Sequence, residues 1–319
     1  MSTETSVPQR PLPFPALLGI EIGGTKLQIA VGDTAARIVE RHRFKVDPAL
    51  GAAGIRRCLA DALSRLTPEV RPSAVGVGFG GPVDWRTGRI SKSHQIEGWS
   101  EFPLGPWLQE LTGAPVWVDN DGNVAALGEA WHGAGRESNP VFYVTLGSGV
   151  GGGLVVDGRI FHGAPPGEAE IGHVRLDRNG TIVEKRCSGW AVDARIRQLK
   201  AAGSTSQLCQ LAGDTVGGEA RHLRAAWEAG DSVARSLLQE VAEDLAFGLS
   251  HVVQLFHPAV IVIGGGLSLV GEPLRAAVAA ALPRFVMEVF QGGPRVVLAG
   301  LGEDSVPVGA LELARSARG

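Results

Sequence analysis

The sequence predicts an α/β protein of two domains, each built around a sheet that opens with a glycine-turned hairpin. Two observations carry this prediction. The apolar run ALLGIEI is followed by GGTK and a second apolar run, LQIAVGD, which is the pattern of two strands joined by a tight turn. The stretch VFYVTLGSGVGGGLVVDGRIF repeats this order in mid-chain. The chain therefore looks internally duplicated, and two such hairpins facing one another would enclose a ligand between the domains.

Composition limits the classes of protein and ligand. The chain has 319 residues, 44% hydrophobic and 20% charged, which is enough to build two domain cores. Its 45 glycines are about twice the usual share of roughly 7%. The formal charge of -3, without a long basic run, argues against nucleic acid or an acidic membrane surface as a partner. A small molecule is the expected ligand.

The three cysteines Cys58, Cys187 and Cys209 are widely spaced and odd in number. This spacing argues against a disulfide framework and fits the reducing cytoplasm, where we expect the protein to work. The N-terminal MSTETSVPQRPLPFP lacks a basic segment followed by an apolar one, so residues 1–15 are expected to be a disordered leader, neither a signal peptide nor a membrane anchor.

The expected elements follow in chain order. A small N-terminal domain over 16–120 should hold strands at 16–22, 27–33 and 38–46, a helix at 52–66 and a buried strand in SAVGVGFGGPVD. A larger domain over 121–307 should hold the second hairpin, a long charged helical segment over 217–255 and a strand in HPAVIVIGGGLS. A last helix from about Val308 could pack back on the first domain.

The glycine turns are candidate phosphate sites. GGTK and GSGVGGG both offer unobstructed backbone N–H groups, although neither has the spacing of a Walker A loop. One such turn alone would be interpreted as a sharp hairpin. Two corresponding turns, one beside Glu21 and the other beside Thr145, favour phosphate binding.

A polar cluster stands between an apolar strand and a helix expected to start near Asn123. It comprises Asp119, Asn120 and Asp121 in VWVDNDGNVAALGEA. Helix capping accounts for one of these residues and does not require three. A carboxylate at this point, facing a phosphate turn, is where a base would accept the proton of a substrate hydroxyl. An aspartate of ordinary pKa, about 3.9, is a weak base, so that transfer must come late in a loose phosphoryl transition state.

Together these stretches resemble the ROK family (repressor, open reading frame, kinase), whose kinase members are sugar kinases such as glucokinase. The resemblance runs from about Leu18 to about Ala310. It is carried in the family's order by GIEIGGTK, GFGGPVD, VDNDGN followed by AALGEAW, TLGSGVGGG, EAEIGH, HPAVIVIGGG and LGEDSVPVGA. Any one motif would be weak evidence, whereas seven in order are specific.

The resemblance implies an actin-like ATPase fold of the hexokinase type, with a cleft between two α/β domains that holds ATP with Mg²⁺ and a sugar. It implies that Asp121 is the catalytic base and that domain closure excludes water. The implied sugar ligands are Gly81, Asn120, Asp121, Glu170 and His173. The implied ATP and phosphate ligands are Glu21, with a possible role toward Mg²⁺, Gly23, Gly24, Thr25, Lys26, Thr145, Gly147, Ser148, Gly149, Gly264, Gly265 and Gly266.

One segment departs from the family pattern. Members of the family follow Glu-X-Gly-His with three cysteines that bind a structural zinc together with the motif's His. Here the segment reads RNGTIVEKRCSGWAV and retains only Cys187. Because a structural zinc needs four protein ligands, we expect no zinc, and completion by Asp177 or Glu184 would be uncommon. His173 would then need a hydrogen bond to its second ring nitrogen to orient it.

The same alignment places Gly189 where the family has a further sugar-binding Glu. Either the sugar pocket has lost an acceptor and changed its preference among hexoses, or activity is reduced. Glu184 could substitute if the loop takes another path. The milder change from NDAN to NDGN loosens the helix start.

Two other functions are considered. The family contains repressors with a helix-turn-helix domain before the first hairpin, and fewer than twenty residues precede it here, so we expect no DNA binding. A pseudokinase is disfavoured by the retained Asp121, Glu170 and His173, and weakly favoured by Gly189. The expected partners are a sugar and ATP, with a homodimer as the expected assembly.

The remaining histidines and several tryptophans show no partner pattern, and we interpret them as packing or surface residues. They are His42, His94, His132, His162, His222, His251 and His257, with Trp85, Trp99, Trp107 and Trp131.

Overall fold

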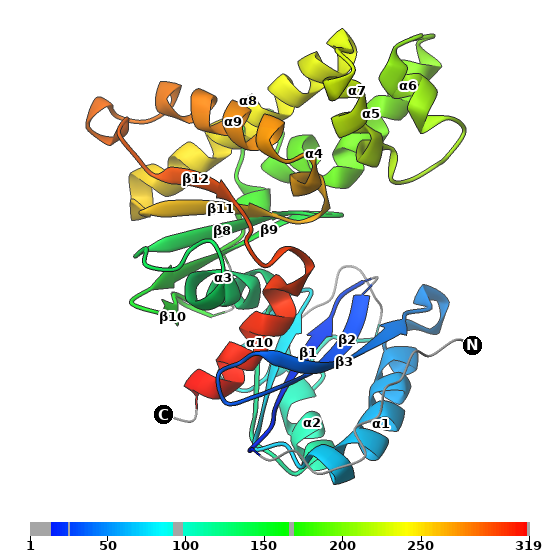
Figure 1. The fold of residues 1–319 in the computed structure, drawn as a ribbon, viewed down its shortest axis with the longest axis vertical. Helices are drawn as coiled ribbons and strands as arrows, with labels where there is room; N and C mark the ends of the chain where they lie inside the picture. Colours follow the sequence, from blue (N-terminus) through cyan, green and yellow to red (C-terminus); the bar gives the residue numbers. More distant parts are fainter. Residues whose placement is uncertain (1–13, 25, 92–97, 166–168, 318–319) are drawn as a thin grey trace. The chain divides into compact units, whose positions relative to one another are not determined.

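Two five-stranded mixed sheets organise the computed structural model, which describes residues 14–24, 26–91, 98–165 and 169–317 (Figure 1). The first sheet has the order β3-β2-β1-β4-β7 and the second the order β10-β9-β8-β11-β12. In each sheet an antiparallel hairpin, β1–β2 or β8–β9, is followed by parallel strands. The predicted α/β class is therefore confirmed, and the two hairpins are the two predicted from the glycine-turn pattern.

The chain divides into two units. The first contains residues 1–132, 159–168 and 303–319, and the second contains 133–158 and 169–302. The helix that follows β7 and the last helix of the chain thus both belong to the first unit. The leader predicted over 1–15 lies almost wholly outside the described residues.

In the first unit, local sequence patterns explain most elements. Strands β1 and β4 are buried on both faces, as expected for strands covered by helices on either side. The bounds are β1 Leu17–Ile22, β2 Lys26–Gly32, β3 Ile38–Lys45, α1 Gly51–Val70, β4 Ala74–Phe79, β5 Val83–Asp84, β6 Arg89–Ile90, α2 Leu104–Thr112, β7 Val116–Asn120, α3 Asp121–His132 and α10 Ser305–Ser316.

Helix α10 packs on β1 and β4 and on α3 (Figure 1). The approach is close enough to need glycine: a Cβ on Gly309 would lie 1.8 Å from the carbonyl oxygen of Val124, and one on Gly76 would lie 1.9 Å from that of Ala310. A buried carboxylate joins the two helices, because Glu312 accepts hydrogen bonds from His132 Nε2 at 2.8 Å and from Arg315 and Ser316. The end of the chain therefore forms part of the first unit's core.

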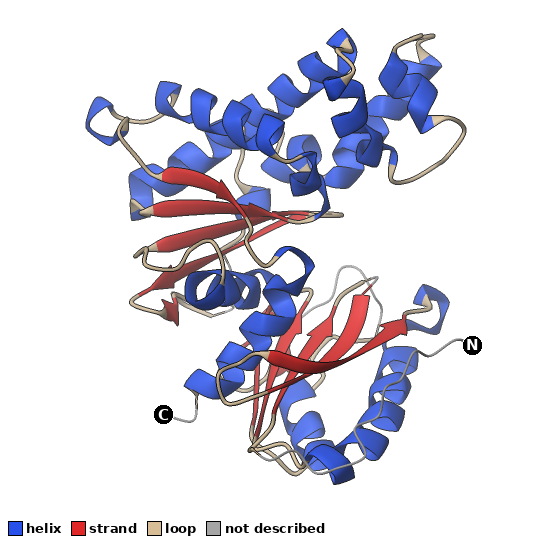
Figure 2. Cartoon of the chain, viewed as in Figure 1, coloured by secondary structure: helices blue, strands red, loops and turns tan. Residues whose placement is uncertain are grey.

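In the second unit, helices α8 and α9 pack together and against the sheet, as Figure 2 shows. The bounds in this unit are β8 Val141–Leu146, β9 Val150–Val156, α4 Val183–Cys187, α5 Gly189–Ala201, α6 Gln207–Ala212, α7 Leu223–Glu228, α8 Ser232–Phe256, β11 Val260–Gly264, α9 Glu272–Ala281 and β12 Arg295–Leu298. The short strand β10, Arg159–Ile160, falls among the residues of the first unit. Short 3₁₀ helices include η2 Ile171–His173, η3 Glu219–His222 and η4 Gly266–Val270.

The helical segment predicted over 217–255 is interrupted. It consists of η3, α7 and α8, and the break before α8 falls at Gly230, whose φ is +86°. Asp231 then caps α8, because its Oδ1 accepts from the backbone N–H groups of Val233 and Ala234 at 2.7 and 3.1 Å. The single long helix predicted for this segment is therefore divided at the Gly230–Asp231 break.

Among the described residues, none of the helices combines the length and the apolarity that a bilayer crossing requires.

Candidate functional site

In the first unit, three predicted motifs end at one edge of the sheet. Strand β4 pairs in parallel with both β1 and β7, with Phe79 opposite Ile22 on one side and Asn120 on the other. Parallel strands finish on the same edge, so the residues that follow Ile22, Phe79 and Asn120 are neighbours. This brings the GGTK turn, the GGPVD turn and Asp121 together.

Asn120 organises the start of α3. Its Oδ1 accepts from the backbone N–H of Gly122 at 2.8 Å and from that of Asn123 at 3.4 Å. Its Nδ2 donates to the carbonyl of Gly81 at 3.2 Å, which connects two of the predicted sugar-binding residues. Because this side chain caps the helix, α3 begins at Asp121 rather than near Asn123.

Gly80 leaves room beside the candidate base. Its N–H donates to the carbonyl of Ile22 at 2.8 Å. A Cβ at position 80 would lie 3.4 Å from Asp121 Oδ2 and 3.5 Å from Gly23 Cα. The carboxylate of Asp121 therefore lies close to the first glycine turn, with only a glycine between them.

Glu21 is 8% exposed and accepts a hydrogen bond from the side-chain amide of Gln28. Burial raises the pKa of the Glu21 carboxyl, while the Gln28 hydrogen bond and the charge of Lys26 act against that rise. The side chain of Lys26 is half-exposed and lies 3.6 Å from the carboxylate of Glu303. Gly23 and Gly24 are half-buried, and Thr25 lies outside the described residues.

In the second unit, two further glycine turns meet at one sheet edge. Strands β8 and β11 are parallel, with Gly264 opposite Thr145. Gly265 has a φ of +81°, and a Cβ there would lie 2.5 Å from the backbone nitrogen of Leu146. This contact packs Gly265 against Leu146, the residue that precedes the turn with Gly147, Ser148 and Gly149.

Glu170 and His173 are exposed at either end of η2. The turn between them packs closely against β9, because a Cβ on Gly172 would lie 2.1 Å from the carbonyl oxygen of Val150. No hydrogen bond joins the imidazole of His173 to a residue in the described ranges. The orienting hydrogen bond expected for this ring is therefore not seen in the described part of the chain.

The segment that departs from the zinc pattern forms helix α4 and the start of α5. Cys187 is fully buried in the core, its thiol 3.7 Å from the carbonyl of Val241, and burial raises the pKa of that thiol. None of the three cysteines is clustered with another, and the described residues contain no group of three His, Cys, Asp or Glu side chains placed to hold a metal.

Glu184 and Gly189 instead hold the second glycine turn. Glu184 Oε2 accepts from the backbone N–H of Val150 at 2.9 Å, and it would lie 2.4 Å from a Cβ on Gly149. The N–H of Gly189 donates to the carbonyl of Gly147 at 2.7 Å, and a Cβ on Gly189 would lie 2.9 Å from the same oxygen. A side chain at position 189 would therefore come too close to the Gly147 carbonyl in this turn.

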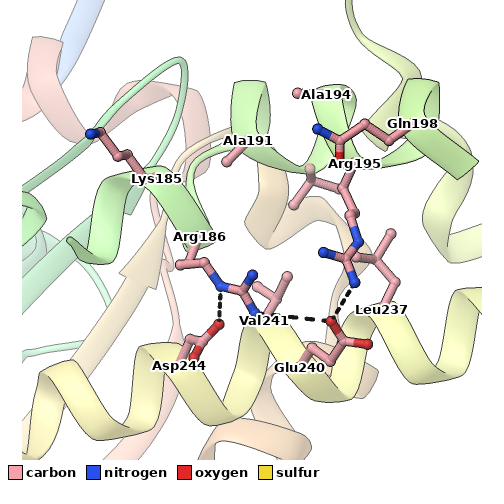
Figure 3. A pocket seen from close by; sticks show the side chains of 11 residues that line it. Lys185, Arg186, Ala191, Ala194, Arg195, Gln198, Leu237, Glu240, Val241 and Asp244 are labelled. Carbon is pink, nitrogen blue, oxygen red and sulfur yellow. Dashed lines mark hydrogen bonds and ion pairs between the residues drawn. The ribbon is translucent and has the colours of Figure 1, made fainter. Parts of the chain in front are cut away.

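A pocket of about 220 Å³ lies between α4, α5 and α8 (Figure 3). Both arginines in its lining pair with carboxylates: Arg186 with Asp244 at 2.7 Å and Arg195 with Glu240 at 3.1 Å. No residue predicted for the site lines it. The candidate residues of each unit therefore lie at that unit's sheet edge or next to it, and not in this pocket.

Sequence patterns missed one polar group at the candidate site. His162 Nε2 donates to Asp119 Oδ2 at 2.5 Å, although the two residues are 43 positions apart. The sequence shows no partner pattern for this histidine. The residue type alone carries no signal for such a long-range contact.

Comparison with known proteins identifies the chain's relatives. Residues 17–317 match the model of the ROK family. A glucokinase from Halalkalibacterium halodurans is 33% identical over 92% of this chain and 92% of its own length. A xylose repressor from Caldicellulosiruptor bescii is 24% identical over 81% of this chain and 67% of its own.

Among solved structures, a ROK family glucokinase from Streptomyces griseus, in complex with glucose and AMPPNP, superimposes with a TM-score of 0.81. It is 31% identical, and the match covers 94% of this chain and 99% of that one.

Proposed function

This chain belongs to the ROK family, and on that premise we propose that it is an ATP-dependent kinase that phosphorylates a hydroxyl of a hexose or hexosamine. The observation that carries the proposal is the convergence of Asp121, Asn120 and Gly81 beside the GGTK turn at one sheet edge. A carboxylate next to a glycine turn provides a proton acceptor beside a candidate anion site, although the N–H of Gly23 itself donates to the carbonyl of Lys26 at 2.7 Å. The relatives named glucokinase support the same reaction class.

In this proposal Asp121 accepts the proton of the attacking hydroxyl, and the transfer is coupled to breaking of the bond between the γ-phosphorus and its leaving oxygen. Asn120, Glu170 and His173 hydrogen-bond the sugar hydroxyls, each of which is both donor and acceptor. Because these polar groups stay unpaired when a hydroxyl is absent, they would reject sugars that lack it. The glycine turns hold the phosphates through their backbone N–H groups.

The first unit offers oxygen ligands of the kind Mg²⁺ prefers. Gln28 Oε1 is buried without a hydrogen-bond partner in the described part of the chain, and the carboxylate of Glu21 lies beside it. A bound cation would favour the ionised form of Glu21 over the protonated form that burial favours. When bound with ATP, Mg²⁺ would supply charge neutralisation at the phosphates.

Glu184 has a supporting role within this proposal. The family's sugar-binding Glu corresponds to Gly189, while Glu184 hydrogen-bonds Val150 at the start of β9, against which η2 also packs. The carboxylate of Glu184 therefore lies at the start of β9, the strand against which the turn with Glu170 and His173 packs. We propose that it supports the turn.

The proposal is tested by coupled measurement of ADP release across glucose, mannose, fructose, N-acetylglucosamine and N-acetylmannosamine. We expect turnover on at least one sugar and a loss of about a thousandfold or more in kcat for Asp121→Asn, because the amide cannot accept the proton. Sugar binding by that variant should persist. Absence of turnover on every sugar, with binding retained, would instead support a sugar-binding regulator, the role named for the xylose repressor.

A further inference from the structure

We infer that His162 is a positioning residue for the candidate base, acting through Asp119 on Asn120 and on the first turn of α3. The inference rests on the proposed kinase function for its catalytic consequence. Its structural part, the hydrogen-bond chain from His162 to α3, lies wholly within the first unit and can be tested without any turnover.

Asp119 is the centre of this chain. It is 3% exposed and precedes Asn120 and Asp121 at the end of β7. Its Oδ1 accepts from the backbone N–H of Asn120 at 2.8 Å and from the side-chain amide of Asn123 at 3.0 Å. One carboxylate thus connects the last strand residue to the first turn of the helix on which Asp121 lies.

The other oxygen of Asp119 is held by His162. Nε2 of the imidazole donates to Oδ2 at 2.5 Å, and the histidine side chain is only 16% exposed. A buried carboxylate oxygen that loses its donor is costly, and the carboxylate is expected to rotate or to draw in water. Either response would disturb the two hydrogen bonds that Oδ1 makes to Asn120 and Asn123.

The imidazole itself is fixed by stacking. Its ring lies on the indole of Trp85, with centroids 4.1 Å apart and planes 14° apart, and the guanidinium of Arg86 lies 5.2 Å from the centroid of the same indole. Trp85 follows the GGPVD turn, whose Gly81 accepts from Asn120. Stacking restrains the plane of the ring, and the hydrogen bond from Nε2 to Asp119 Oδ2 sets which edge of the ring faces the carboxylate.

The distinction between positioning and packing can be made with two substitutions. His162→Gln keeps an N–H donor for Asp119 and removes the ring, whereas His162→Phe keeps a ring on Trp85 and removes the donor. We expect His162→Phe to lower kcat by roughly ten- to a hundredfold with KM for sugar and ATP within about threefold of wild type, since a misplaced catalytic group costs rate more than affinity. His162→Gln should recover most of that loss.

Amide hydrogen exchange supplies a readout that does not depend on turnover. In His162→Phe, peptides covering residues 120–124 should exchange faster than in wild type, and in His162→Gln they should exchange as in wild type. His251→Ala serves as the matched control: its ring contacts Phe247 within the second unit, and neither kcat nor exchange at 120–124 should change.

The inference fails if His162→Phe matches wild type in both kcat and exchange, or if the Gln and Phe variants are equally impaired in both. Absence of turnover in the wild-type protein would overturn the proposed function instead, and the exchange comparison would still decide whether His162 orders the start of α3.

Discussion

Replacing Glu312 by Gln should destabilise the protein strongly at neutral pH and hardly at all in acid. The carboxylate is fully buried and accepts from His132 Nε2, Arg315 and Ser316. Burial by itself would raise the pKa of Glu312, but the hydrogen bonds from His132, Arg315 and Ser316 outweigh it and lower the pKa from 4.5 to about 2. At about 1.4 kcal/mol per pKa unit, this shift corresponds to about 3 kcal/mol of folding stability.

The sign of the pH dependence follows from the lowered pKa. A group whose pKa is lower in the folded state contributes its full stability above the unfolded value of 4.5, and that contribution is lost as pH falls toward about 2. Urea unfolding of wild type and Glu312→Gln should therefore differ by about 3 kcal/mol at pH 7. The difference should shrink progressively below pH 4.5.

A matched control is Glu228→Gln, which removes a carboxylate whose side chain is 56% exposed and paired with Arg224 on one helix. Exposed pairs of this kind contribute little to stability, so this variant should unfold like wild type at every pH. A constant difference between Glu312→Gln and wild type from pH 7 to pH 3 would refute the reasoning, because it would show that the ionised form of Glu312 is not the stabilising species.

Two further predictions concern the segment around α4. Glu184→Ala should raise KM for ATP several-fold, because it leaves the N–H of Val150 at the second glycine turn without its acceptor. Glu184→Gln keeps an acceptor and should have a KM for ATP near that of wild type. Equal KM values in all three proteins would contradict a supporting role for Glu184. Metal analysis of the purified protein should find no stoichiometric zinc, and Cys187 should react with a thiol reagent only after unfolding, because burial raises the pKa of its thiol. Zinc at about one equivalent, lost with Cys187→Ala, would show that the segment still binds metal.

Local patterns predicted both hairpins and strands β3, β4, β7 and β11, but not the short strands β5, β6 and β10 or strand β12. Alternating and continuous apolar runs indicate strands, and paired glycines indicate tight turns, so both hairpins and the edge carrying Asn120 and Asp121 could be predicted from neighbouring residues. Helix α3 begins two residues before its predicted start, because Asn120 rather than a later residue caps it, and only the folded side chain decides which residue does so.

Long-range partners were decided by the tertiary structure. Nothing in the sequence pairs His162 with Asp119, or Glu184 with the N–H of Val150, since each contact joins segments that only the sheet and its crossovers bring together. The same holds for Gly189, whose neighbour is the carbonyl of Gly147. The fold class could be predicted from apolar periodicity and paired glycines because these are local properties, whereas the family and most candidate residues followed from the resemblance of seven motifs. The packed structure decided which side chains hold those residues in place, because a hydrogen bond depends on distance in space and not along the chain.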